Sequence, residues 1–118
     1  MSKVALVVLA DTESHADLGG VFNALVAAKE FKAGGDDVGL VFDGAGTQWP
    51  GVLSDPGHRA HGIYEQVSDV VTGACGYRAK AFDAEDSVRT AHVHLLDEYE
   101  GHPTFRQLVT DGYQAITF

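Results

Sequence analysis

The chain has 118 residues, of which 45% are hydrophobic and 21% are charged, so it can form one domain with a substantial core. Its formal net charge of −9 repels phosphate backbones and anionic membranes, and we therefore expect neither nucleic acid nor a membrane as a partner. The single cysteine excludes an intrachain disulfide, and we expect a cytoplasmic protein.

Short apolar runs alternate with segments of helical periodicity along the chain. The first run, residues 3–9, is interpreted as a buried strand and not as a signal peptide or a membrane span. Further strands are predicted at 38–42, 69–74 and 113–118. Helices are predicted from Asp17 to the glycines at 34–35, from Pro56 (capped by Asp55) to about 67, over 77–82, and from Pro103 to Gly112. A loop is expected at 43–53, and 88–96 is either irregular or a short strand.

Strands that are apolar throughout and separated by helices are typical of a parallel sheet. We predict one domain spanning 1–118 with a small flavodoxin-like α/β fold, whose mainly parallel sheet has four or five strands and helices on both faces. Residues 3–9, 38–42 and 70–74 should be adjacent parallel strands. Because open α/β sheets bind ligands beyond the carboxyl ends of their strands, any site should lie among 10–20, 43–49 and 75–81.

No cofactor site is predicted. The "GAG" at 44–46 is only a fragment of the dinucleotide-binding fingerprint, because Trp49 stands where its third glycine belongs. The segment after the first strand contains Asp11, Glu13 and Asp17, which would repel a phosphate at the start of the following helix. Flavin, NAD and ATP are therefore disfavoured.

No metal site is predicted either. The pairs His58/His61 and His92/His94 match no metal-binding signature, and one cysteine cannot form a thiolate zinc site. We interpret these histidines as solvated surface residues. Asp11 and Asp43 could form an acid–base pair, but aspartates that follow strands are also common turn and cap residues.

Cys75 is the candidate catalytic residue. A free cysteine is most often a small buried hydrophobe, but this one lies where a predicted strand passes into a helix. The first N–H groups of that helix and the cation of Arg78 could stabilise a thiolate, while Gly73 and Gly76 leave room for a reactant. These features leave a reactive and a structural role equally open. If Cys75 is reactive, it should be partly accessible, with a pKa below the ordinary value of about 8.5.

Three segments resemble DsrE/DsrF-like proteins of sulfur-relay systems: "KVALVVLAD" (3–11), "DVVTGACGYRAKAF" (69–82) and "LLDEYEGHPTFRQLVTDGYQAITF" (95–118). The family carries its sulfur-accepting thiol after the third strand, a position that Cys75 matches. The resemblance implies a persulfide on Cys75, donor and acceptor proteins with thiols as partners, and a homotrimer or homohexamer. Arg78 stands where a C-x-x-C motif would need its second cysteine, which excludes an internal dithiol–disulfide cycle.

On this interpretation Cys75 accepts sulfane sulfur and passes it on. The turn formed by Gly76, Tyr77 and Arg78 would stabilise the sulfur anion, and His15 and Trp49 would line the site from neighbouring loops. Two alternatives remain, a homo-oligomeric binding module for a small ligand or protein and a cysteine redox sensor without sulfur transfer. Trp49, Phe82 and Tyr99 lie in or near predicted loops, which also favours an oligomer, since a monomer would struggle to bury them all.

Overall fold

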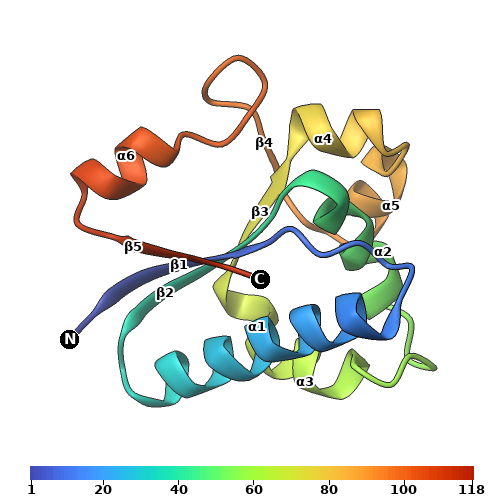
Figure 1. The fold of residues 1–118 in the computed structure, drawn as a ribbon, viewed down its shortest axis with the longest axis horizontal. Helices are drawn as coiled ribbons and strands as arrows, with labels where there is room; N and C mark the ends of the chain where they lie inside the picture. Colours follow the sequence, from blue (N-terminus) through green and yellow to red (C-terminus); the bar gives the residue numbers. More distant parts are fainter.

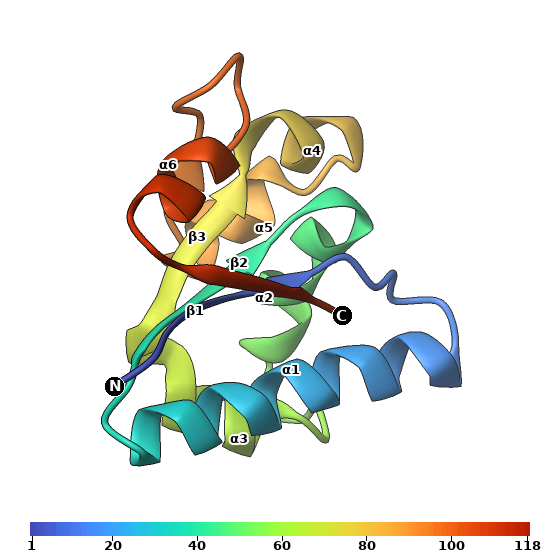
Figure 2. The ribbon, with the colours of Figure 1, turned by 60° about the vertical axis from the view of Figure 1, so that its left-hand side comes forward.

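The computed structural model describes all 118 residues as an α/β fold built on one five-stranded parallel sheet (Figure 1). Its strands are β1 (Lys3–Val8), β2 (Asp37–Phe42), β3 (Val71–Cys75), β4 (Leu95–Leu96) and β5 (Gln114–Thr117). They are arranged in the order β4-β3-β2-β1-β5, and every neighbouring pair is parallel. The predicted flavodoxin-like class and the adjacency of the first three strands are confirmed. Figure 2 shows β5 beside β1 at the front of the sheet.

Six α-helices and two short 3-10 helices connect the strands. The α-helices are α1 (His15–Ala33), α2 (Trp49–Leu53), α3 (His61–Val67), α4 (Gly76–Ala81), α5 (Glu85–Thr90) and α6 (Phe105–Thr110), and the 3-10 helices are η1 (Gly44–Gln48) and η2 (Ser68–Val70). Only α1 is long, and its Ser14 cap accepts a hydrogen bond from the N–H of Asp17. None of the helices combines the length and the apolar character that crossing a membrane requires.

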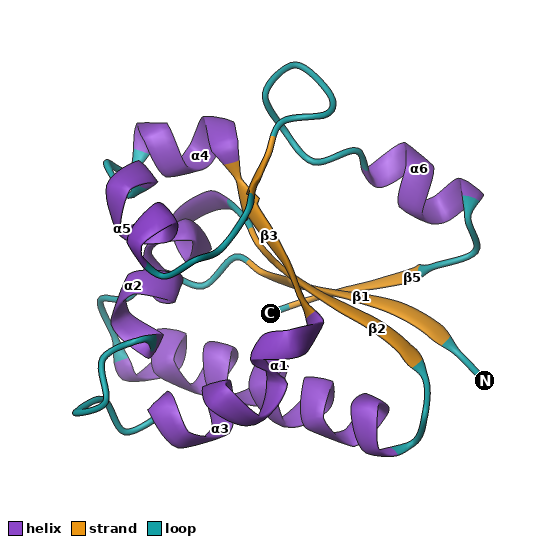
Figure 3. Cartoon of the chain, turned by 180° about the vertical axis from the view of Figure 1, so that it is seen from behind, coloured by secondary structure: helices purple, strands orange, loops and turns teal.

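The helices are divided unequally between the two faces of the sheet. From β1 to β4 the chain steps across the sheet in one direction, and right-handed crossovers in one direction all fall on the same face. The connection from β4 to β5 steps back past β1, so its helix α6 lies on the opposite face from α1 and α3 (Figures 1 and 3). Helices therefore flank both faces, as predicted, but one face has α6 alone.

The hydrophobic core reflects this division. On the face covered by α1 to α5, 19 buried residues form one cluster, to which alternate residues of β1 contribute Val4, Leu6 and Val8. The face under α6 has a cluster of three, Val7, Val41 and Leu96. No residue of α6 is buried and all four residues of β5 are exposed, so this part of the molecule is the least anchored.

Residues 43–53 form helices where a loop was predicted. Asp43 caps η1, and Gly46 packs so closely that a Cβ atom there would lie 2.1 Å from the carbonyl oxygen of Val8. Trp49 begins α2 and is buried with its Nε1 donating to the Ala10 carbonyl at 2.9 Å. Tertiary packing of this tryptophan, which sequence periodicity does not show, holds the segment in a helical path.

The helix predicted from Pro56 begins at His61 instead. Asp55 accepts a hydrogen bond from the N–H of Gly57, which folds this stretch into a turn and not into a first helical turn. The predicted third strand also begins later, because Asp69 and Val70 belong to η2. The ambiguous segment 88–96 divides between the end of α5 and the two-residue strand β4.

His61 is half-buried, so its interpretation as a solvated surface histidine is wrong. Its Nδ1 lies 2.7 Å from the Leu53 carbonyl oxygen and its Nε2 lies 2.8 Å from the Glu65 carboxylate. The Leu53 carbonyl raises the pKa of His61 above its ordinary value, burial opposes the increase, and Glu65 adds to it. The imidazole thus joins the end of α2 to the start of α3.

Candidate functional site

Cys75 lies at the point where the direction of chain crossing reverses. The connection that leaves β3 crosses one face of the sheet, and the connection that leaves β4 crosses the other. In open α/β sheets the crevice between two such strands is the usual ligand site. Cys75 ends β3 and pairs with Leu96 at the end of β4, so it stands at the floor of this crevice.

A histidine after β4 completes the site. The Nδ1 atom of His102 lies 3.3 Å from the Sγ atom of Cys75. The His102 ring stacks on Tyr77, with 4.6 Å between the ring centroids and 27° between the planes. Tyr77 belongs to the first turn of α4, so the strand–helix junction holds both the thiol and the ring that orients its partner. A thiol beside an imidazole is a pair that can exchange a proton.

The turn that presents His102 is tightly constrained. Tyr99 and His102 exchange two backbone hydrogen bonds of 2.8 Å each, and between them Glu100 and Gly101 both have positive φ. Such a turn favours glycine at its second central position, which Gly101 supplies. The Gly101 carbonyl accepts a hydrogen bond from the N–H of Tyr77 at 2.9 Å. The loop after β4 is thereby fastened to the start of α4, directly over Cys75.

The environment of the thiol corrects two expectations. Cys75 is buried, with 0% of its surface exposed, where partial accessibility was predicted. Its pKa is raised, not lowered: burial is the main cause, and the nearby Asp43 carboxylate adds to it. The N–H groups of Arg78 and Tyr77 act in the opposite direction, and the Arg78 N–H lies 3.4 Å from Sγ. The predicted stabilising donors are present, but desolvation outweighs them.

Arg78 acts through its backbone and not through its charge. Its guanidinium lies over the Tyr77 ring, 5.7 Å from the ring centroid, and forms no ion pair with the sulfur or with a carboxylate. Gly76 does not leave the predicted room for a reactant, because a Cβ atom there would lie 3.3 Å from the Leu96 carbonyl oxygen, tight against the neighbouring strand. Of the three residues of the turn, Tyr77 is the one whose side chain contributes to the site, through its stacking on His102.

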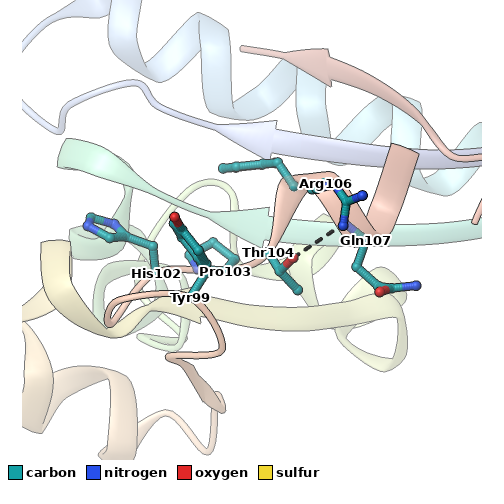
Figure 4. Close-up of a pocket in the computed structure, with 7 residues that line it drawn as sticks. Tyr99, His102, Pro103, Thr104, Arg106 and Gln107 are labelled. Atoms are coloured by element: carbon teal, nitrogen blue, oxygen red, sulfur yellow. Dashed lines mark hydrogen bonds between the residues drawn. The ribbon is translucent and has the colours of Figure 1, made fainter. Parts of the chain in front are cut away.

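A cavity of about 620 Å³ is lined by His102 but not by Cys75. Its lining residues are Tyr99 and the run from His102 to Gln107. Figure 4 shows His102 at one end of this row and Gln107 at the other, with Thr104 accepting a hydrogen bond from the Gln107 N–H at the start of α6. His102 thus faces both the thiol and a space large enough for a small molecule.

The structure does not bring His15 and Trp49 to Cys75. Both line a different cavity of about 300 Å³ beyond β1, together with His58. The Trp49 ring meets His58 edge-on, with 6.0 Å between centroids. These two residues remain near the predicted edge of the sheet, but the contacts of Cys75 involve residues that follow β2, β3 and β4.

Comparison with known proteins gives one relative. The chain is 26% identical to an uncharacterized protein of the archaeon Methanocaldococcus jannaschii over 98 residues. The aligned region covers 81% of this chain and 78% of that protein. No family model matches the chain. No solved structure matches it. The resemblance to DsrE/DsrF-like proteins therefore stays a prediction.

His102 is the functional candidate that sequence reasoning missed. It follows β4, whose two residues are too few for any periodicity to reveal a strand. Without that strand, the loop at 97–104 could not be assigned to the same edge of the sheet as Cys75. The sequence pairs Asp43 only with Asp11, whereas the electrostatic effect of Asp43 falls on Cys75. No three His, Cys, Asp or Glu side chains gather where they could hold a metal ion.

Proposed function

We propose that the chain is a sulfur-relay protein that carries a persulfide on Cys75. The observation that supports this proposal is the 3.3 Å contact between Sγ of Cys75 and Nδ1 of His102 at the crevice between β3 and β4. A structural cysteine needs no imidazole at its sulfur, whereas a sulfur carrier needs a group that removes the thiol proton. The resemblance to sulfur-relay proteins, whose accepting cysteine follows the third strand, supports the same chemistry.

Each half of the relay is a thiol exchange. His102 takes the proton of Cys75, and the thiolate attacks the outer sulfur of a donor persulfide. A sulfur–sulfur bond forms on Cys75 while the donor's bond breaks, and the donor leaves as a thiolate. In the second half an acceptor thiolate attacks the outer sulfur and releases Cys75 as a thiolate. The Arg78 N–H, 3.4 Å from Sγ, stabilises the sulfur anion in both halves.

Access to the buried thiol requires the loop at 97–104 to move. Three contacts hold the turn at 99–102 over Cys75: the Sγ–Nδ1 contact, the stacking of His102 on Tyr77, and the hydrogen bond between Tyr77 and Gly101. The buried Pro103 holds the end of the loop. The following helix α6 has no buried residue that would resist the movement. Elements with so few buried contacts open at low free-energy cost, so a buried resting thiol and a working carrier are compatible.

The direct test is the mass of the intact protein after incubation with a persulfide donor. We expect a gain of about 32 Da, one sulfur atom, that dithiothreitol removes and that the Cys75→Ser variant lacks. Treatment with peroxide in parallel separates the relay from a redox sensor, which would gain oxygen instead. A native protein that gains no sulfur, although the unfolded chain does, would overturn the proposal.

A binding module is the second candidate, and the burial of Cys75 favours it. A thiol with no exposed surface and a raised pKa is a poor nucleophile in the closed structure. The cavity beside His102 offers aromatic rings and the Arg106 guanidinium to a small ligand without covalent chemistry. In that case the Cys75→Ser variant would bind the same ligands as the native chain, whereas a relay would lose its function.

The resemblance also supports two proposals about context. One is a homotrimer or homohexamer, in which donor and acceptor thiol proteins would approach the crevice. The other is a cytoplasmic location, which suits a chain whose only cysteine has to stay reduced. Sedimentation of the purified chain and fractionation of cells test these two statements separately from the thiol chemistry.

A further inference from the structure

The two edges of the sheet differ in how they are protected. Edge strands expose unpaired backbone groups, and proteins usually shorten them or add charges, prolines or bulges to prevent pairing with another chain. The edge at β4 follows this rule, because it has two residues and is followed by Asp97 and Glu98. The edge at β5 does not: its sequence Gln-Ala-Ile-Thr has no charge and no proline, its register is regular, and all four residues are exposed.

The backbone of β5 has unused hydrogen-bonding groups that face outward. The N–H of Phe118 donates to Val7, and its carbonyl accepts from Leu9, so Phe118 bonds to β1. Backbone groups in a strand alternate in direction, and Ile116 and Gln114 therefore also bond to β1. The N–H and carbonyl groups of Ala115 and Thr117 point to the free side.

The last 18 residues of the sequence, which include β5, have no net charge. Residues 101–118 contain one acidic residue, Asp111, and one basic residue, Arg106, for a net charge of zero. The other 100 residues therefore hold the whole formal charge of −9. Two copies of this chain repel each other through most of their surface but not through β5, where Ile116 has 39% of its surface exposed.

We propose that β5 pairs antiparallel with β5 of a second copy of this chain, about a two-fold axis at Ile116. This register sets Ala115 opposite Thr117 of the second copy, and Thr117 opposite Ala115 of the second copy. Each of these two pairs exchanges two backbone hydrogen bonds, so the outward N–H and carbonyl groups form four hydrogen bonds in all. The two Ile116 side chains then meet across the axis at the short spacing of a pair without hydrogen bonds, and each covers the other. A contact of this kind is self-complementary, as a two-fold interface must be.

The decisive variant is Ala115→Pro. It removes one outward N–H from each copy and fills the edge with a ring, while the bonds of β5 to β1 use other residues and remain. Sedimentation of the native chain should give an assembly containing pairs, with a simplest mass of twice 12.5 kDa, that strengthens with added salt. In the variant the dissociation constant of the pair should rise about 30-fold or more. Ala115→Val keeps the N–H and should leave the assembly unchanged.

A second variant tests the same axis without touching the backbone. Ile116→Lys sets two ammonium groups face to face and should separate the copies, whereas Val26→Lys, at an exposed position of α1, should not. Two results support the pairing equally: a native dimer that dissociates to monomers in both edge variants, or a native hexamer that dissociates to trimers in both. A native chain that sediments as a monomer or as a trimer at micromolar concentration overturns it, because a trimer cannot be composed of two-fold pairs. An assembly that neither variant alters also overturns it. Cys75→Ser should assemble like the native chain, because the pairing does not depend on the thiol.

Discussion

Replacing His102 by alanine should make Cys75 more accessible, although His102 is the partner proposed to activate it. In the closed structure the thiol has no exposed surface, so a reagent such as iodoacetamide reaches it only when the loop at 97–104 opens. His102→Ala removes two of the three contacts that hold the loop, the stacking on Tyr77 and the contact with Sγ. The hydrogen bond between Tyr77 and Gly101 remains.

The size of the effect follows from these two contacts. A stacked aromatic pair and a hydrogen bond each contribute about 1 kcal/mol, so the loop should open more readily by about 2 kcal/mol. At about 1.4 kcal/mol for each factor of ten, the open fraction and the labelling rate should rise about 30-fold. His102→Phe keeps the stacking and loses only the nitrogen, and its rate should rise about fivefold.

The assay is the rate of iodoacetamide labelling of the folded protein, followed by intact mass, with the unfolded chain as the reference for intrinsic reactivity. His94→Ala, which removes an exposed histidine from the segment before β4, serves as the matched control and should label like the native chain. The rates are compared at about pH 9.5, where an exposed thiol ionises without help from His102. A rate for His102→Ala equal to or below the native rate at that pH would refute the reasoning, because the ring would then not hold the loop over the thiol.

Three further changes test other parts of the structure. Gly46→Ala should lower the free energy of unfolding by about 2 kcal/mol or more, because its Cβ would overlap a carbonyl of β1, whereas Gly62→Ala meets open space in a helix and should raise it by about 0.5 kcal/mol in thermal or urea unfolding. The pKa of His61 is raised in the folded state, so protonation of His61 should stabilise the fold fully below about pH 6.5, and this stabilisation should disappear as the pH rises through the pKa of the folded state. The unfolding midpoint of the native chain should therefore depend on pH in this range, and the midpoint of His61→Gln should not. Asp43→Asn keeps a capping side chain but removes a charge that raises the Cys75 pKa, so the labelling rate should increase at a lower pH than in the native chain. An unchanged pH profile would mean that the Asp43 carboxylate does not act on the thiol.

The sequence predicted the sheet well where the strands are long. The apolar runs that became β1 and β2 lie wholly inside the sheet, so almost every side chain in them has to be apolar and the pattern is unmistakable. The prediction of a loop at 43–53 was wrong because the structure of this segment does not follow from its local pattern. Its helices depend on Trp49 packing into the core and on Gly46 meeting β1, which are contacts between distant segments and leave no local period.

Of the two side chains at the centre of the candidate site, the sequence predicted one. Cys75 was found because the end of a clear strand, a glycine and a possible helix start are all local features. His102 was missed because its position depends on β4, which two residues define. The burial of the thiol was missed for the same reason, since the loop that covers it follows that strand. The local sequence predicted the position of the Cys75 thiol, but only the fold shows that His102 contacts it and that the loop at 97–104 covers it.

The reversal of the chain after β4 explains both the location of the site and the weakness of its cover. Because the crossovers before β4 all fall on one face, that face receives the helices that build the main core. The segment after β4 crosses alone to the other face, where it finds only the small cluster of Val7, Val41 and Leu96. The same reversal opens the crevice in which Cys75 lies and provides the loop that carries His102 across it. The loop that must move to expose the thiol is therefore followed directly by a helix that this fold anchors weakly.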